Sequence, residues 1–101
     1  DKNKPISLNV DVSDPIINNL NYTINARYVT FNINVTEINF DEISYIDWSS
    51  ARPVWRRLCT RLKNNLCINK KSFSIGNHDL TIQVTDEAGN SVGRNINFNI
   101  I

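Results

Sequence analysis

The chain is poor in the side chains that most catalytic and metal sites require. Its 101 residues include one histidine, His78, and two cysteines, Cys59 and Cys67. Two thiols and a distant histidine do not complete the tetrahedral shell of a zinc site. His78 is followed by Asp79, and adjacent residues of a strand point to opposite faces, so this pair does not form an orienting Asp–His dyad. We therefore expect no enzyme activity, no catalytic residue and no metal site.

Long apolar runs are also missing. No run approaches the roughly 18–20 apolar residues that span a bilayer, and no signal peptide is recognisable. Because residues 1–4 are polar and Ile100-Ile101 continue a strand-like pattern, we expect both ends to be cuts from a longer chain. Any export signal or anchor is then expected outside this fragment, which itself makes no membrane contact. No nucleic-acid-binding motif is present, so we expect no nucleic acid partner.

Alternation of apolar and polar side chains with a period of two dominates the chain, and this pattern is typical of half-buried strands. The clearest example is residues 29–36. Four further segments alternate in the same way: residues 6–11, 43–48, 80–85 and 95–100. Turn-forming residues such as Asp14-Pro15 and Gly76-Asn77 separate them. The pattern, together with the ordinary size and composition, predicts a single domain over residues 1–101, an all-β antiparallel sandwich of five to seven strands.

The two cysteines are suited to one disulfide only if the chain reverses between them. In a helix Cys59 and Cys67 would be about 12 Å apart and in a straight strand about 26 Å, whereas a disulfide needs Cα atoms within about 7 Å. Asn64-Asn65 is a suitable turn, because asparagine tolerates left-handed backbone. Two buried free thiols are the alternative. Leu58, Leu62 and Leu66 recur every fourth residue, which favours a short helix or an irregular loop over residues 54–66.

Acidic residues are absent from residues 52–71, which carry seven of the eleven positive charges. The remaining residues carry four positive and all ten negative charges, a net of −6. The candidate binding surface in this basic segment consists of Trp55, Arg56, Arg57, Arg61 and Lys63. It is suited to an anionic glycan or to the acidic face of a neighbouring copy. The alternative is a solvated loop without a partner.

The two tryptophans and the asparagines of two sequons are further candidates for exposed functional residues. Trp48 is expected to pack in the core, whereas Trp55, which is followed by Arg56 and Arg57, is expected to be exposed and available for cation–π contact. Asn21-Tyr22-Thr23 and Asn34-Val35-Thr36 are glycosylation sequons. In a chain with seventeen asparagines two such triplets also arise by chance, so Asn21 and Asn34 are candidates rather than assigned sites.

The stretch from Ser74 to Asn90 resembles the closing hairpin of immunoglobulin-like modules of bacterial and archaeal surface proteins. It matches the run G-x-H-x-L-T-x-x-V/A-x-D-x-A-G-N of those modules from Gly76 onward. Pro5-Ile6-Ser7-Leu8, Asn21-Tyr22 and residues 29–37 are similar to their opening strands, and residues 55–73 resemble archaeal versions more weakly. The resemblance covers about the first 48 and the last 30 residues, and it implies an immunoglobulin-like sandwich with an irregular disulfide-closed insertion.

The closing motif also has a direct physical interpretation. Gly76 allows a positive φ where the strand begins, and Asp86 can accept backbone N–H groups of the turn at residues 87–90. Gly89 and Asn90 then supply the left-handed positions of a tight connection. Related sandwiches bind calcium with loop carboxylates, so a calcium site at Asp86 is an alternative. We otherwise expect no cofactor.

The function that the resemblance implies is structural. We expect an extracellular module of an exported cell-surface glycoprotein: a surface-layer (S-layer) protein, an adhesin stalk or a filament subunit. Its expected partners are neighbouring domains or copies of the same protein. The alternative is a carbohydrate- or protein-binding module that uses the basic segment, with an anionic glycan as ligand. A third reading is an accessory domain of a secreted hydrolase.

Overall fold

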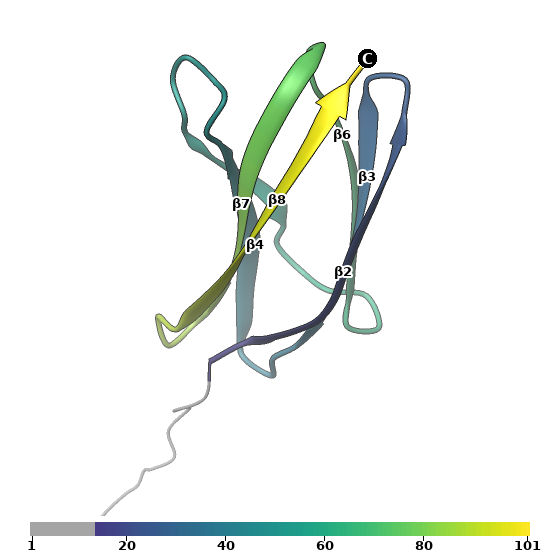
Figure 1. Cartoon of the computed structure of the whole chain (residues 1–101). Helices are drawn as coiled ribbons and strands as arrows, with labels where there is room; N and C mark the ends of the chain where they lie inside the picture. The colour runs from purple at the N-terminus through teal and green to yellow at the C-terminus, as the bar shows by residue number, and fades with distance from the viewer. Residues whose placement is uncertain (1–13) are drawn as a thin grey trace, which may run out of the picture.

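The computed structural model describes residues 14–101, which form an all-β domain (Figure 1). Its strands are β2 (Ile16–Asn25), β3 (Tyr28–Thr36), β4 (Phe40–Asp47), β5 (Trp55–Cys59), β6 (Leu66–Ser72), β7 (Gly76–Asp86) and β8 (Ser91–Ile100). The strand expected at residues 6–11 and the similar Pro5-Ile6-Ser7-Leu8 lie outside the described residues.

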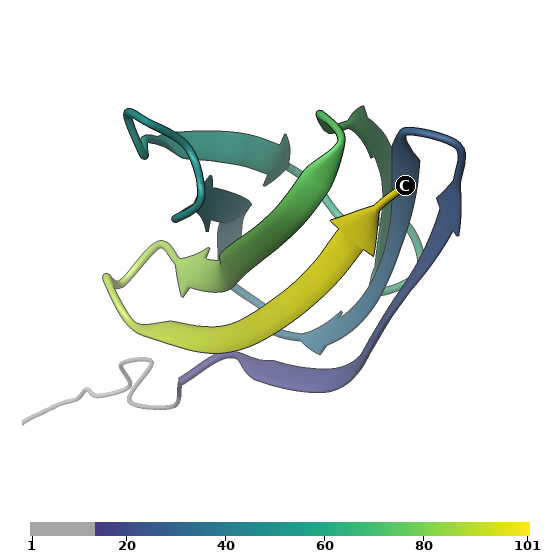
Figure 2. The ribbon, with the colours of Figure 1, turned by 45° about the horizontal axis from the view of Figure 1, so that its top comes forward.

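The seven described strands form two antiparallel sheets that pack face to face (Figures 1 and 2). One sheet has the strand order β2-β3-β6 and the other has the order β5-β4-β7-β8. The chain crosses from one sheet to the other after β3, after β5 and after β6. Strands distant in the sequence are therefore neighbours: β3 pairs with β6, and β4 pairs with β7. The expected all-β sandwich of about seven strands is confirmed.

The interior between the sheets is filled by alternate side chains of the central strands. The fully buried ones in β3 and β7 are Val29, Phe31, Ile33, Val35, Leu80, Ile82 and Val84. Burying one such side chain contributes about 1.5–3 kcal/mol relative to leaving it in water. This gain explains why the period-two pattern specifies which face of each strand turns inward.

An aromatic cluster closes one end of this interior. Its central member is Phe73, which comes from the connection between β6 and β7 and is 7% exposed. Its ring centroid lies 5.1 Å from that of Phe98, 6.3 Å from that of Phe31 and 6.1 Å from that of Tyr45. The backbone N–H of Phe73 also donates to the carbonyl of Arg27, in the β2–β3 turn, at 2.8 Å. Phe73 therefore fixes this connection to both sheets.

Strand β2 brings its apolar side chains to the inner face by means of a bulge. Its register with β3 shifts at Asn18, which is an extra residue in the ladder. Ile17 and Leu20 are an odd number of positions apart, so an unbroken strand would send one of them to solvent. With the bulge, both lie on the inner face, opposite the buried Val35 and Ile33.

The edge formed by β2 and β8 is linked across the two sheets by side chains. Arg94 of β8 lies opposite the buried Ile82, hence on the inner face, and its Nη2 donates to the carbonyl of Ile17 at 3.2 Å. The hydroxyl of Tyr22 in β2 donates to the carbonyl of Asn97 in β8 at 3.1 Å. Inward-pointing charges of this kind also discourage pairing of an edge strand with another molecule.

The helix considered for residues 54–66 is not formed. Trp55–Cys59 is instead strand β5, which pairs with β4, and Leu58 is buried there at 3% exposure. The chain then reverses at Asn64 and Asn65 before Leu66 begins β6. The helical prediction is wrong because pairing with β4 satisfies the backbone of this segment and a tight turn ends it.

Candidate functional site

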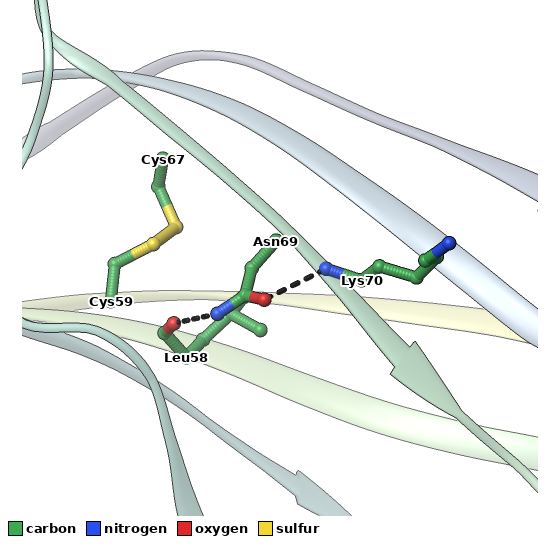
Figure 3. Close-up of a disulfide and its surroundings, with 5 residues drawn as sticks. All are labelled: Leu58, Cys59, Cys67, Asn69 and Lys70. Carbon is green, nitrogen blue, oxygen red and sulfur yellow. Dashed lines mark hydrogen bonds between the residues drawn. A yellow bond between two sulfur atoms is a disulfide. The ribbon is translucent and has the colours of Figure 1, made fainter.

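The edge formed by β5 and β6 is closed by a disulfide (Figure 3). It joins Cys59, at the end of β5, to Cys67 in β6, with 6.0 Å between the Cα atoms. Asn64 and Asn65 between them have φ values of 53° and 64°, as a two-residue turn with two left-handed positions requires. The disulfide expected from the sequence is confirmed, and the alternative of two free thiols is wrong.

A side-chain amide adds a second link beside the disulfide (Figure 3). Asn69 lies opposite the buried Phe31 in the β3–β6 ladder, so its side chain points between the sheets. Its Nδ2 donates to the carbonyl of Leu58 in β5 at 2.6 Å, and its Oδ1 accepts from the backbone N–H of Lys70 at 2.8 Å. An edge strand of one sheet is thus bonded to an edge strand of the other.

Farther along the same edge lies an open cleft of about 620 Å³. Arg56 and Lys71 extend into it from β5 and β6 respectively. Arg56 lies opposite Tyr45 and Lys71 lies opposite Val29 in their ladders. Directly paired residues share one face of a sheet, and both partners belong to the core. Both cationic side chains therefore start from the inner faces of the sandwich.

The floor of the cleft holds a hydrogen-bonded cluster around His78, which is 6% exposed. Its Nδ1 lies 2.6 Å from Oδ2 of Asp47, and its Nε2 lies 2.8 Å from the carbonyl oxygen of Ser74. Both oxygens can only accept, so both ring nitrogens donate when the imidazole carries two protons. Ser49 Oγ donates to Oδ1 of Asp47 at 2.6 Å and lies 3.2 Å from Nδ1.

The partner of His78 is thus Asp47, which the sequence did not indicate. The two residues are 31 positions apart and meet because Asp47 lies opposite Leu80, a close neighbour of His78 on the same face of β7. The cluster lacks the connectivity of a catalytic triad, in which the acid and the hydroxyl bind different ring nitrogens. Here Asp47 and Ser49 share Nδ1, and a backbone carbonyl occupies Nε2.

The protonation states in the cleft follow from its contacts. Burial by itself would raise the pKa of Asp47, but hydrogen bonds from Ser49 and His78 outweigh it and hold that pKa below its ordinary value. Asp47 is therefore ionised at neutral pH. Burial raises the pKa of Tyr45, although nearby Arg56 acts in the opposite direction. Tyr45 is therefore a neutral phenol, which can both donate and accept a hydrogen bond.

The cations of the cleft are not neutralised within residues 14–101. The ion pairs found there are that of His78 and one between Arg57 and Glu42, with 3.4 Å between Nε and Oε1. Neither includes Arg56 or Lys71. The only carboxylate that lines the cleft within this range is the partner of His78.

The five residues of the candidate binding surface are divided among three places. Trp55, 48% exposed, and Arg57 lie on the outer face of the four-stranded sheet, because they flank the inward-directed Arg56 along β5. Arg61 and Lys63 belong to the loop between β5 and β6 and line a separate hollow beside the disulfide. The structure therefore does not bring all five together on one surface.

Trp48 is 53% exposed, so the expectation that it packs in the core is wrong. The inner positions of β4 are Ile43 and Tyr45, which places the even-numbered neighbours on the outer face. The indole Nε1 of Trp48 donates to Thr81 Oγ1 at 2.9 Å, and that hydroxyl donates to Asn95 Oδ1 at 2.7 Å. Trp48 is thus anchored on the outside of the four-stranded sheet.

The two sequons differ in accessibility. Asn21 is exposed on β2, whereas Asn34 is half-buried on β3. The Nδ2 of Asn18 donates to Oδ1 of Asn34 at 2.9 Å and to Oγ1 of Thr36 at 2.7 Å. Of the two glycosylation candidates, the folded domain presents Asn21 more openly.

Asp86 organises the turn between β7 and β8. It is 2% exposed; its Oδ1 accepts from the backbone N–H groups of Ala88 at 3.0 Å and Asn90 at 2.8 Å. Its Oδ2 accepts from Asn90 Nδ2 at 3.0 Å. Burial would raise the pKa of Asp86, but these hydrogen bonds lower it. Gly89 has φ +94°, whereas Asn90 has no positive φ, so the left-handed backbone expected at Asn90 is wrong.

The carboxylate of Asp86 therefore accepts hydrogen bonds from the turn that it begins. Across residues 14–101 no group of three or more histidine, cysteine, aspartate or glutamate side chains is placed to hold a metal ion. The same part of the chain has no helix long and apolar enough to cross a membrane.

No known protein family model, curated protein or solved structure matches this chain. Among the contacts of the domain, two features stand out: the disulfide-closed edge and the cationic cleft beside it.

Proposed function

We propose that this domain is an immunoglobulin-like structural module of an exported bacterial or archaeal cell-surface protein, such as a surface-layer protein, an adhesin stalk or a filament subunit. The disulfide between Cys59 and Cys67 is the observation that carries the proposal. Structural disulfides persist in oxidising compartments and are rare where thiols are kept reduced. The motif from Gly76 to Asn90, which resembles that of surface modules, supports the same role.

The cross-links between the sheets also suit a structural module. A spacer under load must keep its two sheets together, and each open edge has its own covalent or hydrogen-bonded tie. The disulfide and Asn69 tie β5 to β6, and Tyr22 and Arg94 tie β2 to β8. Edges bridged in this way resist separation of the sheets and present fewer unpaired backbone groups to other chains.

Surface location is the first test of this role. An antibody raised against the folded domain is expected to label intact cells of the source organism, and brief protease treatment of those cells is expected to remove the signal. An antibody against a cytoplasmic protein of the same cells serves as the control and should label only permeabilised cells. Domain signal that likewise requires permeabilisation would contradict the proposal.

A further inference from the structure

Two cationic side chains converge on one cleft, and among residues 14–101 neither of them forms an ion pair. Arg56 and Lys71 stand on edge strands of opposite sheets and line the same opening. Asp47 is engaged by His78 and Ser49, and among residues 14–101 its single carboxylate stands against the two cations of the lining. The cleft therefore carries a positive potential, which concentrates anions.

Protection of the sheet edges accounts for an inward-pointing charge on β5 and another on β6, because each is an edge strand of its own sheet. It does not account for the equal sign of the two charges. A second cation on the facing strand adds repulsion across the cleft, since Lys71 and Arg56 carry the same sign. The arrangement becomes favourable when an anion lies between the two side chains.

The remaining lining of the cleft is rich in hydroxyl groups. They belong to Tyr45, Ser49, Ser50, Ser72 and Ser74. A hydroxyl both donates and accepts, so such a lining is complementary to a ligand that carries hydroxyl groups of its own. The volume of about 620 Å³ falls within the range usual for small-ligand sites.

We propose that this cleft binds an acidic saccharide, whose carboxylate lies between Arg56 and Lys71 while its hydroxyl groups meet the serines and Tyr45. Arginine and lysine form charge-assisted hydrogen bonds with carboxylates, and these are stronger than bonds between neutral groups. This site goes beyond the structural role proposed above and does not depend on it.

Calorimetric titration with an oligosaccharide of galacturonic acid tests the site. The intact domain is expected to bind it, and a neutral oligosaccharide of equal length is expected not to bind. Arg56→Gln and Lys71→Gln are each expected to weaken binding by about tenfold or more, because each removes a charge-assisted contact. Higher salt is expected to weaken binding, since both cations are open to solvent.

Adjacent residues provide matched controls. Arg57→Gln and Lys70→Gln remove the same charges from the same strands, but both residues lie on the outer faces. Both variants are expected to bind the saccharide within about twofold of the intact domain. Thermal unfolding of all four variants checks their folding, and Lys71→Gln is expected to be at least as stable as the intact domain because it relieves repulsion.

Three outcomes would overturn the site. The first is absence of binding to the acidic oligosaccharide. The second is an equal loss of binding in Arg57→Gln and Lys70→Gln, which would show attraction to the overall basic surface. The third is tighter binding of a hexaglutamate peptide than of the saccharide, which would assign the cleft to an acidic protein partner.

Discussion

Phe73→Ala is expected to lower the free energy of unfolding by about 3–5 kcal/mol, the usual cost of removing a buried phenylalanine ring. The ring of Phe73 contacts those of Phe31, Tyr45, His78 and Phe98. Its removal leaves a cavity at the end of the interior that these neighbours cannot fill without moving away from their strands. Urea denaturation followed by circular dichroism measures the loss.

Ile75→Ala is the matched control, because Ile75 belongs to the same connection but is 68% exposed. Its free energy of unfolding is expected to stay within about 0.5 kcal/mol of that of the intact domain. A loss below about 1 kcal/mol for Phe73→Ala would show that Phe73 does not belong to the core, because truncation of a core aromatic costs several times more.

The second large effect is expected from the disulfide. The double variant Cys59→Ala, Cys67→Ala is expected to lose about 2–3 kcal/mol of unfolding free energy on the chain-entropy model. The reason is that the bond closes a loop with a sequence separation of 8 and restricts the unfolded chain. Cys67 is 1% exposed, so its truncation adds a small packing loss.

Reduction of the unaltered domain separates these two contributions. Treatment with a thiol reductant removes the cross-link but leaves both side chains in place, so it is expected to give most of the loss seen in the double variant. The hydrogen bond from Asn69 to Leu58 does not involve either cysteine, so it and the fold are expected to persist in both cases. Identical denaturation midpoints for the oxidised and reduced domain would contradict a stabilising role for this bond.

The sequence was sufficient to identify the strands whose alternation is regular. In β3, over residues 80–84 of β7 and at the end of β8, every second residue is apolar and buried, so pattern and structure coincide. The closing turn was also recognisable, because Asp86 and Gly89 are the residue types that such a turn requires. Such local patterns can be recognised in the sequence without knowledge of the strand pairing.

Strand β2 escaped prediction because the bulge at Asn18 interrupts its period. Ile17 and Leu20 both face the core, yet their spacing of three residues does not fit the period of two that marks a strand. A bulge is a property of the ladder with β3 and is visible only once the pairing is known. Strand β5 has five residues and a register shift of its own, so it offers too short a pattern to recognise.

Strand β6 has mainly polar side chains on its inner face and an apolar side chain on its outer face. Its inner face carries Cys67, Asn69 and Lys71, whereas Ile68, 59% exposed, points outward. Such an edge strand needs polar inner side chains, because they bridge to β5 or face the cleft. This strand was not predicted from the sequence, because its inner face is not apolar; only the disulfide expected at Cys67 was indicated.

The residues of the cleft could be predicted from the sequence only in part. The cluster of cations in residues 52–71 was evident, but a strand sends successive side chains to opposite faces. Arg56 is therefore separated from Arg57, and Lys71 from Lys70, by the sheet itself. The contact of His78 with Asp47 depends on the β4–β7 register, which no local motif encodes.

The state of the two cysteines in the native protein tests the account most directly. The protein is isolated from its source without reductant, its free thiols are alkylated, and it is digested with trypsin. Cleavage after Arg57, Arg61, Lys63 and Lys70 places the cysteines on separate peptides, residues 58–61 and 64–70. We expect mass spectrometry to find these two peptides joined, with neither cysteine alkylated. Two separate alkylated peptides would contradict both the disulfide-closed edge and the exported role.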